Sequence, residues 1–436
     1  MTIDAEKTKE FSVSERNELD LPQKFQYKKN QVVIVECRNY NSQTIRTALK
    51  KIIKLLDMDS YFQRKKILLK PNYLAPSEYA YTEPKIVITL SEILKELGAD
   101  QILVGDSTMT KGLTSITLKR TCIKEECEEN DLELINFFES DRKKIVLENP
   151  SSAAEPQIFL PKQAADADIV INMPKLKTHN GYVYTGAIKN LFGLLSNKMK
   201  MHMKYKNKTL FQKLLADIYF AVEQTGNEDH PKMLTIMDGV IAMEGNGPRA
   251  GEPRSTNVLI AGFNPAAVDS VGFSLMNGNP NQLTAIKSVA NRTNLDINME
   301  NLEILGVSDH KKYVIRDFKK PSLKVLQERQ VSGLFSKIAD KMTSISIKIN
   351  KSNCTLCQQC VNHCPAEAMV RKNNRIVIDQ EKCVECFCCG ESCPNDAISA
   401  KFYLFRVLPY LILALVGFGI GIGFGIWYLV IFLSTL

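Results

Sequence analysis

Cysteine is concentrated in one short segment of this chain. Nine of the twelve cysteines lie between Cys354 and Cys393, in a sequence of 436 residues. Eight of the nine form two copies of the run Cys-x2-Cys-x2-Cys-x3-Cys-Pro, which begin at Cys354 and Cys383. In such a run three thiolates bind one iron–sulfur cube and the fourth reaches a second cube. The segment therefore predicts a local cofactor site rather than a disulfide scaffold.

The spacing also predicts which cysteines share a cluster. One [4Fe-4S] cluster is expected on Cys354, Cys357, Cys360 and Cys393, and the other on Cys383, Cys386, Cys389 and Cys364. Zinc sites prefer a longer gap between ligand pairs, and a cytoplasmic location disfavours disulfides. Cys388 is expected to be a spectator because the regular spacing is filled without it. With a short strand at Arg375–Ile378, residues 350–400 predict a small α+β, bacterial-type ferredoxin module that carries single electrons.

The C-terminus carries a long apolar run. No charged side chain follows Arg406, which leaves thirty residues up to Leu436. A helix needs about 20 apolar residues to cross a bilayer, so one transmembrane helix is predicted at 407–433. A buried core helix is the alternative, but the length and the lack of charge argue against it. Lys401 and Arg406 flank the near side, so the positive-inside rule predicts a single-pass cell-membrane protein whose other domains are cytoplasmic.

Two further segments are expected to act near the membrane. Gly417, Gly421 and Gly425 would share one face of the predicted span. That spacing permits self-association or packing with a partner helix, although glycine is also simply tolerated in lipid. Residues 306–349 are rich in lysine and predict a basic linker, with a helix over Leu323–Asp340, that could touch anionic lipid headgroups.

The N-terminus and the overall charge exclude several classes. Residues 1–30 are polar and mixed in charge, without the apolar core of a signal peptide, which predicts a flexible tail and no export. The net charge of +8 permits an anionic substrate or a negatively charged membrane surface. The basic linker lacks interleaved aromatic residues, so nucleic-acid binding is not predicted.

Residues 31–305 alternate between apolar runs and helical patterns. Strands are predicted at Gln31–Cys37, Lys66–Asn72, Gln101–Ser107, Asp168–Lys175, Met233–Gly239 and Asn257–Gly262, and helices at Gln43–Leu56, Pro84–Leu97, Leu210–Val222 and Pro265–Met276. The apolar runs are continuous, which is typical of strands buried on both faces of a parallel sheet. The fold class predicted is therefore α/β, with a doubly wound and mostly parallel sheet.

Polar and basic residues follow most of these strands. Lys70 and Asn72 close one strand, Asp106 closes the next, Lys175, Lys177 and His179 follow the third, and Asp238–Gly239 is expected to end the fourth. Ligands of open α/β sheets bind beyond the carboxyl ends of the strands, so these residues should meet in one electropositive cleft for an anionic small molecule. The candidate catalytic residues are Lys70, Lys175, Lys177, His179 and Lys189.

Two other motifs belong to the same region. His202 is a further candidate acid–base or metal group, although its basic surroundings, from Lys198 onwards, otherwise suggest a solvated or membrane-facing loop. Glu244–Pro248 contains two glycines after a strand and can be simply a tight turn. It is not a dinucleotide fingerprint, and the chain contains no Walker loop and no flavin signature.

These motifs together resemble the domain-of-unknown-function 362 family of iron–sulfur-associated prokaryotic proteins, over about residues 31–305. The matching positions are Lys70, Asn72, Pro174, Lys175, Lys177, His179, Lys189, Asn190, Gly193, Asp238, Gly239, Glu244, Gly245, Gly247, Pro248 and Asp269. Members are often similar in carrying a two-cluster ferredoxin module. The resemblance implies the architecture and the clusters but no settled reaction, and the apolar C-terminus departs from the simplest members.

Two functions remain open from the sequence. In the first, the chain is a membrane-anchored redox protein that exchanges electrons with a partner protein and acts on an anionic substrate in the cleft. In the second, it is a binding or assembly subunit whose clusters are structural or merely relay electrons. Whether the chain is an enzyme is therefore left open, with an iron–sulfur oxidoreductase as the candidate.

Overall fold

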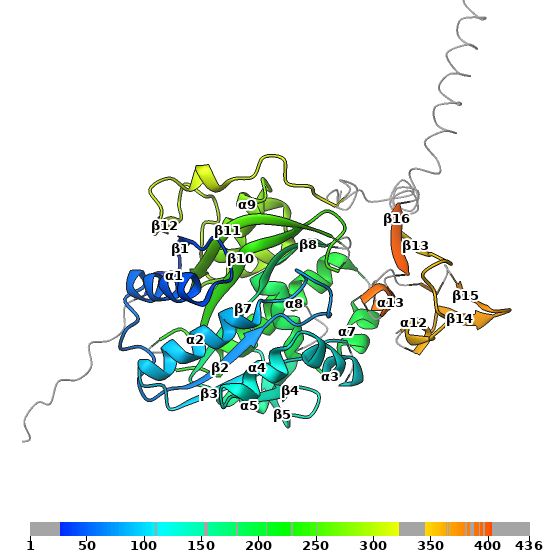
Figure 1. Ribbon diagram of the computed structural model, residues 1–436, viewed down its shortest axis with the longest axis horizontal. Helices are drawn as coiled ribbons and strands as arrows, with labels where there is room; N and C mark the ends of the chain where they lie inside the picture. The colour runs from blue at the N-terminus through cyan, green and yellow to red at the C-terminus, as the bar shows by residue number, and fades with distance from the viewer. Residues whose placement is uncertain are drawn as a thin grey trace, which may run out of the picture.

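The computed structural model describes residues 27–109, 111–151, 156–179, 182–205, 207–227, 230–249, 251–321, 345–362, 364, 366–379, 382–383, 388–391, 393–395 and 397–402. These residues form a large α/β domain and a smaller cysteine-rich module beside it (Figure 1). The predicted tail is described only from residue 27, and the first strand begins at Gln31.

A ten-stranded mixed sheet forms the centre of the large domain as described. Its strands are β1 (Gln31–Glu36), β2 (Lys66–Pro71), β3 (Gln101–Asp106), β4 (Glu133–Asn136), β7 (Ile169–Met173), β8 (Lys175–His179), β9 (Val183–Thr185), β10 (Met233–Glu244), β11 (Glu252–Gly262) and β12 (Glu303–Leu305). The order is β12-β1-β11-β10-β7-β2-β3-β4, and β8 pairs with β10 and β9. Most pairs are parallel, as predicted, but β11 is antiparallel to both β1 and β10. A hairpin of β5 (Arg142–Val146) and β6 (Gln157–Pro161) lies outside this sheet.

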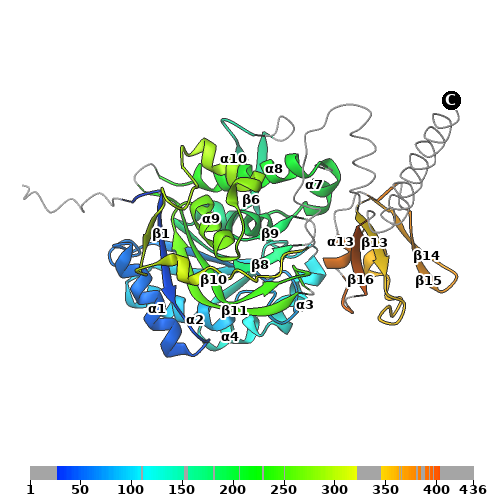
Figure 2. The ribbon, with the colours of Figure 1, turned by 90° about the horizontal axis from the view of Figure 1, so that it is seen from above.

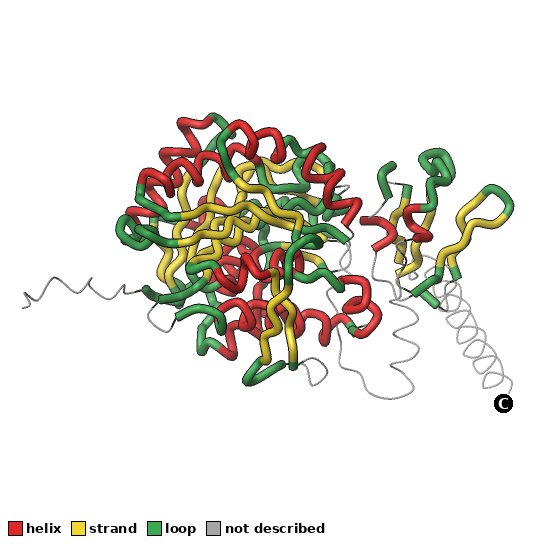
Figure 3. The backbone as a smooth tube through the Cα atoms, turned by 90° about the horizontal axis from the view of Figure 1, so that it is seen from below, coloured by secondary structure: helices red, strands yellow, loops and turns green. Residues whose placement is uncertain are grey.

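Helices cover both faces of the sheet, which makes a three-layer domain (Figures 2 and 3). The helices are α1 (Ser42–Leu55), α2 (Pro84–Glu96), α3 (Lys111–Arg120), α4 (Ile123–Glu129), α5 (Lys162–Asp166), α6 (Ala187–Asn190), α7 (Lys198–Lys204), α8 (Lys208–Glu223), α9 (Pro265–Leu275) and α10 (Thr284–Arg292), with short 3-10 turns η1 (Leu191–Leu194), η2 (Pro280–Gln282) and η3 (His310–Tyr313). Side chains alternate across each strand. Ile67 and Leu69 of β2 therefore join the core beneath α1 and α2, whereas Leu68 joins the core beneath α8 and α9.

The four predicted helices are present as α1, α2, α8 and α9, within two residues of the predicted ends. Local sequence explains their starts. Asn41, Asn207 and Asn264 accept hydrogen bonds from the first free N–H groups of α1, α8 and α9. Proline begins α2 and α9, where its missing N–H costs nothing.

The predicted strand end at Asp238–Gly239 is wrong. β10 continues to Glu244, with an irregularity in its pairing between Gly239 and Ile241. The strand tolerates a buried carboxylate because Lys175, Tyr40 and two backbone N–H groups bind it. The residues from Lys175 to His179 likewise form strand β8 rather than a loop.

The basic run after Asn197 also differs from the prediction. It forms helix α7, and the side chains of Lys198 and His202 are buried rather than solvated. The His202 ring stacks on Phe211 of α8, with ring centres 4.6 Å apart. Its aromatic neighbours hold this segment against the domain although its composition is basic.

The cysteine-rich module contains two small sheets, which lie to one side of the large domain in Figure 1. β13 (Ile345–Ile349) pairs with β16 (Ile398–Phe402), and β14 (Met369–Lys372) pairs with β15 (Arg375–Ile378). Two short helices, α12 (Gln359–Asn362) and α13 (Cys388–Glu391), carry cysteines. The strand expected at Arg375–Ile378 is confirmed. β13 belongs to the range predicted as linker, and within that range Phe318 is buried against the large domain.

Several predictions fall outside the described residues: the span at 407–433, the glycines at 417, 421 and 425, and the linker helix at 323–340. Among the residues that are described, no helix combines the length and the apolar character needed to cross a bilayer.

Candidate functional site

Four cysteines line one cavity of the module. Cys354, Cys357, Cys360 and Cys393 line a space of about 320 Å³, open solvent included, together with apolar residues such as Leu356 and Ile398. Burial, followed by the charges of Cys393, Cys357 and Cys354, raises the pKa of the Cys360 thiol to about 11. Four thiols facing one apolar space fit a [4Fe-4S] cube, whose iron would neutralise the thiolates. This is the ligand set that the spacing predicts. The assignment stays a prediction that this cavity supports.

The second set of cysteines is described only in part. Cys389 is buried in the core of the module, Cys364 and Cys383 are partly buried and pack against it, and Cys386 lies outside the described residues. The backbone N–H of Ala368 donates to Cys364 Sγ at 3.2 Å, and that of Ala397 donates to Cys393 Sγ at 3.3 Å. Hydrogen bonds to cluster sulfur atoms are one means of setting a reduction potential. No three His, Cys, Asp or Glu side chains in the described ranges are placed to hold a single metal ion.

An ion pair lies beneath the C-terminal edge of the sheet. Lys70 Nζ is 2.6 Å from Asp106 Oδ1, and both side chains are almost fully buried. Burial lowers the pKa of Lys70, while the Asp106 charge acts in the opposite direction. A Cβ atom on Gly193 would come within 2.6 Å of the Lys70 amine, so only glycine lets this backbone approach the pair. The Lys70 amine is thus paired with Asp106 inside the protein.

Amide side chains extend the ion pair into a network. Asn190 Nδ2 donates to Asn172 Oδ1 at 2.8 Å, and Asn72 Nδ2 donates to Asn190 Oδ1 at 2.8 Å. Lys177 Nζ donates to Asn72 Oδ1 and to the Ala80 carbonyl. The ends of β2, β7 and β8 are therefore joined through hydrogen bonds. Such buried networks fix side-chain positions when each member has partners.

Lys175 belongs to a separate buried group. Its amine is 2.8 Å from Asp238 Oδ2 and 2.7 Å from the Tyr40 hydroxyl. Tyr40 in turn donates to Asp238 Oδ1 at 2.9 Å, and burial, followed by the Asp238 charge, raises the Tyr40 pKa. This group joins β8 and β10 to the segment after β1.

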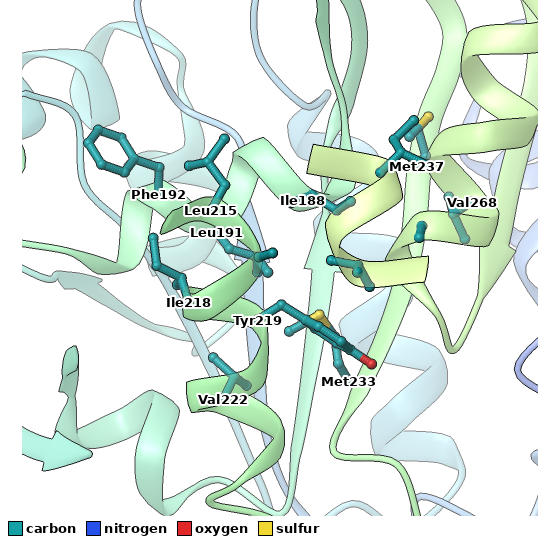
Figure 4. Close-up of a cluster of buried hydrophobic side chains, with 14 of the residues drawn as sticks. Ile188, Leu191, Phe192, Leu215, Ile218, Tyr219, Val222, Met233, Met237 and Val268 are labelled. Carbon is teal, nitrogen blue, oxygen red and sulfur yellow. The ribbon is translucent and has the colours of Figure 1, made fainter. Parts of the chain in front are cut away.

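Asp269 anchors the segment that carries Lys189. Its carboxylate accepts hydrogen bonds from the backbone N–H groups of Ala187 (2.5 Å) and Ile188 (3.0 Å), and from Tyr184 (3.0 Å). Burial raises the Asp269 pKa to about 7, although these hydrogen bonds lower it. Figure 4 shows Ile188, Leu191 and Phe192 among apolar side chains of α8, β10 and α9. Helix α6 is therefore held at its start by Asp269 and along its length by apolar packing.

A pocket opens above the ion pair. It holds about 550 Å³, including solvent at its mouth. It is lined by Asn72, Leu74, Asp106, Ser107, Thr108, Met109, Tyr182, Thr185, Lys189, Asn190, Phe192, Gly193, Lys198 and His202. Of the five candidate catalytic residues, only Lys189 lines this pocket. Lys198 Nζ donates to the carbonyls of Ser107 (3.0 Å) and Thr108 (2.7 Å), which ties α7 to the end of β3.

The glycine loop after β10 contacts the cysteine-rich module. Arg249 Nη1 donates to the Gly390 carbonyl at 2.9 Å, next to Cys389. The Arg249 carbonyl accepts a hydrogen bond from Ser77 at 2.6 Å, and Gly247 lies so close to Thr178 of β8 that a Cβ atom would not fit. Figures 1 and 2 both show α13 on the side of the large domain that carries α3 and α7, and α7 contributes Lys198 and His202 to the pocket lining.

The sequence matches two families in these two regions. Residues 67–274 match Domain of unknown function (DUF362), and residues 346–394 match the 4Fe-4S dicluster domain. The large domain is a DUF362 domain. The ferredoxin-type domain that follows it indicates an iron–sulfur electron-transfer role for the chain.

One curated relative is the thylakoid-associated protein sll1697 of Synechocystis sp., which is 27% identical over 298 residues, 66% of this chain and 86% of the relative. A crystal structure from Thermotoga maritima is similar at 13% identity and a TM-score of 0.37, over 59% of this chain. The lactate racemase apoprotein of Thermoanaerobacterium thermosaccharolyticum is similar at 12% identity and a TM-score of 0.36, over 57% of this chain. The chain covers 60% and 59% of these two structures.

The DUF362 domain gathers the predicted residues only in part. Lys70 and Lys177 share one network, Lys175 is in another, and His179 is buried on β8 with its ring against Tyr182. Sequence reasoning missed Tyr182, Thr185 and Lys198 as pocket residues. Thr185 comes directly before the small residues that begin α6, and this position in the sequence is the signal by which it could have been found.

Proposed function

We propose that this chain is a membrane-anchored iron–sulfur redox protein with two [4Fe-4S] clusters and an anionic substrate in the pocket of the DUF362 domain. The clusters, when bound, supply single-electron transfer. A separate redox protein is the expected electron donor or acceptor. The residues of the DUF362 domain bind and orient the substrate.

The observation that carries this proposal is the hydrogen bond from Arg249 to Gly390. It joins the loop at the C-terminal edge of the sheet to a helix that carries a predicted cluster ligand, Cys389. Substrates of α/β sheets bind at this edge. The contact therefore supports electron transfer between a cluster and a substrate at that edge.

Membrane anchoring is part of the proposal and rests on two observations. The run after Arg406 contains no charged residue, and a relative is described as thylakoid-associated. We place a single span at 407–433 with the rest of the chain in the cytoplasm, and assign self-association to the face of Gly417, Gly421 and Gly425.

The redox role is tested by potentiometry on anaerobically purified full-length protein. Electron paramagnetic resonance should show two clusters that are reduced and reoxidised reversibly. Protein with intact clusters that accepts no electron at any accessible potential would contradict the role. Reversible clusters together with a ligand that is bound but never reduced or oxidised would instead support the assembly subunit.

The contact between the two domains is tested by hydrogen exchange of the full-length protein. Arg249→Met should speed amide exchange in Cys388–Glu391, because the Gly390 carbonyl loses its donor. Arg38→Met is the matched control, since the Arg38 side chain is exposed and pairs only locally with Glu36. Equal exchange in both variants would remove the observation on which the proposal rests.

The anchor is tested by deleting residues 407–436. The full-length chain should sediment with membranes after an alkaline wash, and the shortened chain should stay in the supernatant. Full-length protein in the supernatant would show that the run is no anchor, and would leave the redox role untouched.

A further inference from the structure

The tip of the β14–β15 hairpin is strongly basic. Arg371 and Lys372 end β14, Arg375 begins β15, and all three side chains are exposed. No acidic residue lies between Met369 and Ile378. Lys372 and Arg375 are directly opposite each other in the pairing of the two strands. Like charges at such positions repel each other and destabilise a hairpin, so this arrangement favours an anionic partner.

A tight turn joins the two strands. Asn373 and Asn374 both have left-handed backbone angles, with φ of 44° and 56°, as a two-residue hairpin turn requires. The Asn374 side chain accepts a hydrogen bond from Arg371 at 3.3 Å, and in the described part of the chain none of the three cations forms an ion pair. The positive charges are therefore held together at one end of the hairpin, open to solvent.

The same hairpin forms part of the wall of the cysteine cavity. Ile376 lines that cavity together with the four cysteines predicted to bind one cluster, Cys354, Cys357, Cys360 and Cys393. Arg375 is the neighbour of Ile376 in sequence, and Arg371 is its partner across the hairpin. Cys357 is exposed. A protein that docks on the basic tip therefore comes close to the cluster that these cysteines are expected to bind.

Apolar side chains adjoin the charges. Alternate residues of a strand share a face, so Val370 and Val377 lie on the same face of the hairpin as Lys372 and Arg375. Val370 is 41% exposed. An exposed apolar side chain beside arginine is a combination found in protein–protein interfaces, where arginine is enriched.

The hairpin lies on the side of the module away from the large domain, as Figures 1 and 2 both show. Helix α13 lies on the near side, where the Gly390 carbonyl accepts the hydrogen bond from Arg249. The two predicted clusters therefore have different neighbours. The one that includes Cys389 adjoins the DUF362 domain, and the other adjoins the basic tip.

We propose that the tip of the β14–β15 hairpin docks an acidic redox protein, which exchanges single electrons with the cluster expected on Cys354, Cys357, Cys360 and Cys393. Each transfer moves one electron between the partner's cofactor and that cluster, and no atom or proton is transferred. An anionic lipid surface would also attract these charges, but it would make no use of their position beside the cysteine cavity. This inference rests on the proposed function and says where its redox partner binds.

Docking is tested on the full-length protein in nanodiscs of neutral phosphatidylcholine, with its clusters intact and oxidised. The probe is flavodoxin, an acidic protein with a one-electron flavin, and cytochrome c, a basic one-electron protein, is the comparison. Calorimetry should show that flavodoxin binds, that cytochrome c does not, and that added salt weakens the flavodoxin complex. Bound flavodoxin should also slow amide exchange in Val370–Ile376.

A hairpin variant without the charges tests the assigned contacts. The triple variant Arg371→Gln, Lys372→Gln and Arg375→Gln should weaken flavodoxin binding about tenfold or more, because three attractive charges are lost. The variant should keep its bound iron, since none of the three residues is a predicted cluster ligand.

A matched control removes the same charge from exposed lysines of the large domain, with the substitutions Lys54→Gln, Lys287→Gln and Lys312→Gln. This variant should bind flavodoxin within about twofold of the unchanged protein, because charges distant from a docking surface are screened by salt.

Several results would overturn the docking site. They are a failure of flavodoxin to bind below about 1 mM, equal binding by the hairpin variant, and binding of cytochrome c as tight as that of flavodoxin. Slower exchange in Val370–Ile376 on changing the nanodisc lipid to phosphatidylglycerol, without flavodoxin, would assign the tip to anionic lipid instead. Because no electron transfer is measured, each of these failures is distinct from a failure of the redox role, which potentiometry decides.

Discussion

The buried pair of Lys70 and Asp106 allows a quantitative test of how the pocket floor is built. At 2.6 Å and an effective dielectric constant of about 20, the attraction is about 6 kcal/mol, most of which offsets the loss of hydration. Removing one partner leaves the other charge buried and should cost about 3–5 kcal/mol. Lys70→Met and Asp106→Asn should each show this loss, whereas the double variant should lose less than their sum.

Native-state hydrogen exchange of the full-length protein measures the effect in β2 and β3 themselves. A loss of 3–5 kcal/mol speeds exchange through global opening by about 10² to 10⁴. Burial lowers the Lys70 pKa, so Asp106→Asn should regain stability as the pH rises, because the native state then binds fewer protons than the unfolded state.

The exposed pair of Lys143 and Asp166 supplies the control for this experiment. Lys143→Met should change stability by less than about 0.5 kcal/mol. Single variants at Lys70 and Asp106 that lose under about 1 kcal/mol, or a double variant that is strictly additive, would refute the assignment of Lys70 to a structural pair.

Three further outcomes are expected. Burial raises the Glu223 pKa from 4.5 to about 7. This carboxyl therefore makes the free energy of unfolding fall by up to about 1.4 kcal/mol per pH unit as the pH rises from about 4.5 to 7. Glu223→Gln should remove this pH dependence, as measured by hydrogen exchange. Cys354→Ser should lower bound iron from about eight to about four atoms per chain in anaerobic iron analysis, whereas exposed Cys122→Ser should retain it all. Gly247→Ala should loosen the loop, measured by faster exchange in residues 245–249, because its Cβ would clash with the Thr178 carbonyl oxygen; unchanged exchange would contradict that close approach.

The sequence predicted correctly those elements whose structure depends on interactions between neighbouring residues. The helices that begin after Asn41 and Asn264 were predicted from their helical patterns, because apolar spacing acts over a few turns. The strand end at Asp238 was mispredicted for a tertiary reason, since the lysine that keeps its carboxylate in the sheet lies 63 residues away. Lys198 and His202 were misread similarly, because their buried partners belong to other elements.

The sequence by itself predicted the two cysteine sets and determined the α/β class, because thiolate spacing and apolar periodicity depend on neighbouring residues. Tertiary structure alone decided the composition of the pocket. Several strand-end lysines turn inward to bind Asp106, Asp238 and Asn72, whereas Lys189 lines the pocket, with its amine 5.5 Å from the centre of the Tyr182 ring. Whether an ammonium group faces a ligand or a buried carboxylate depends on what the fold brings against it, and those partners come from distant strands.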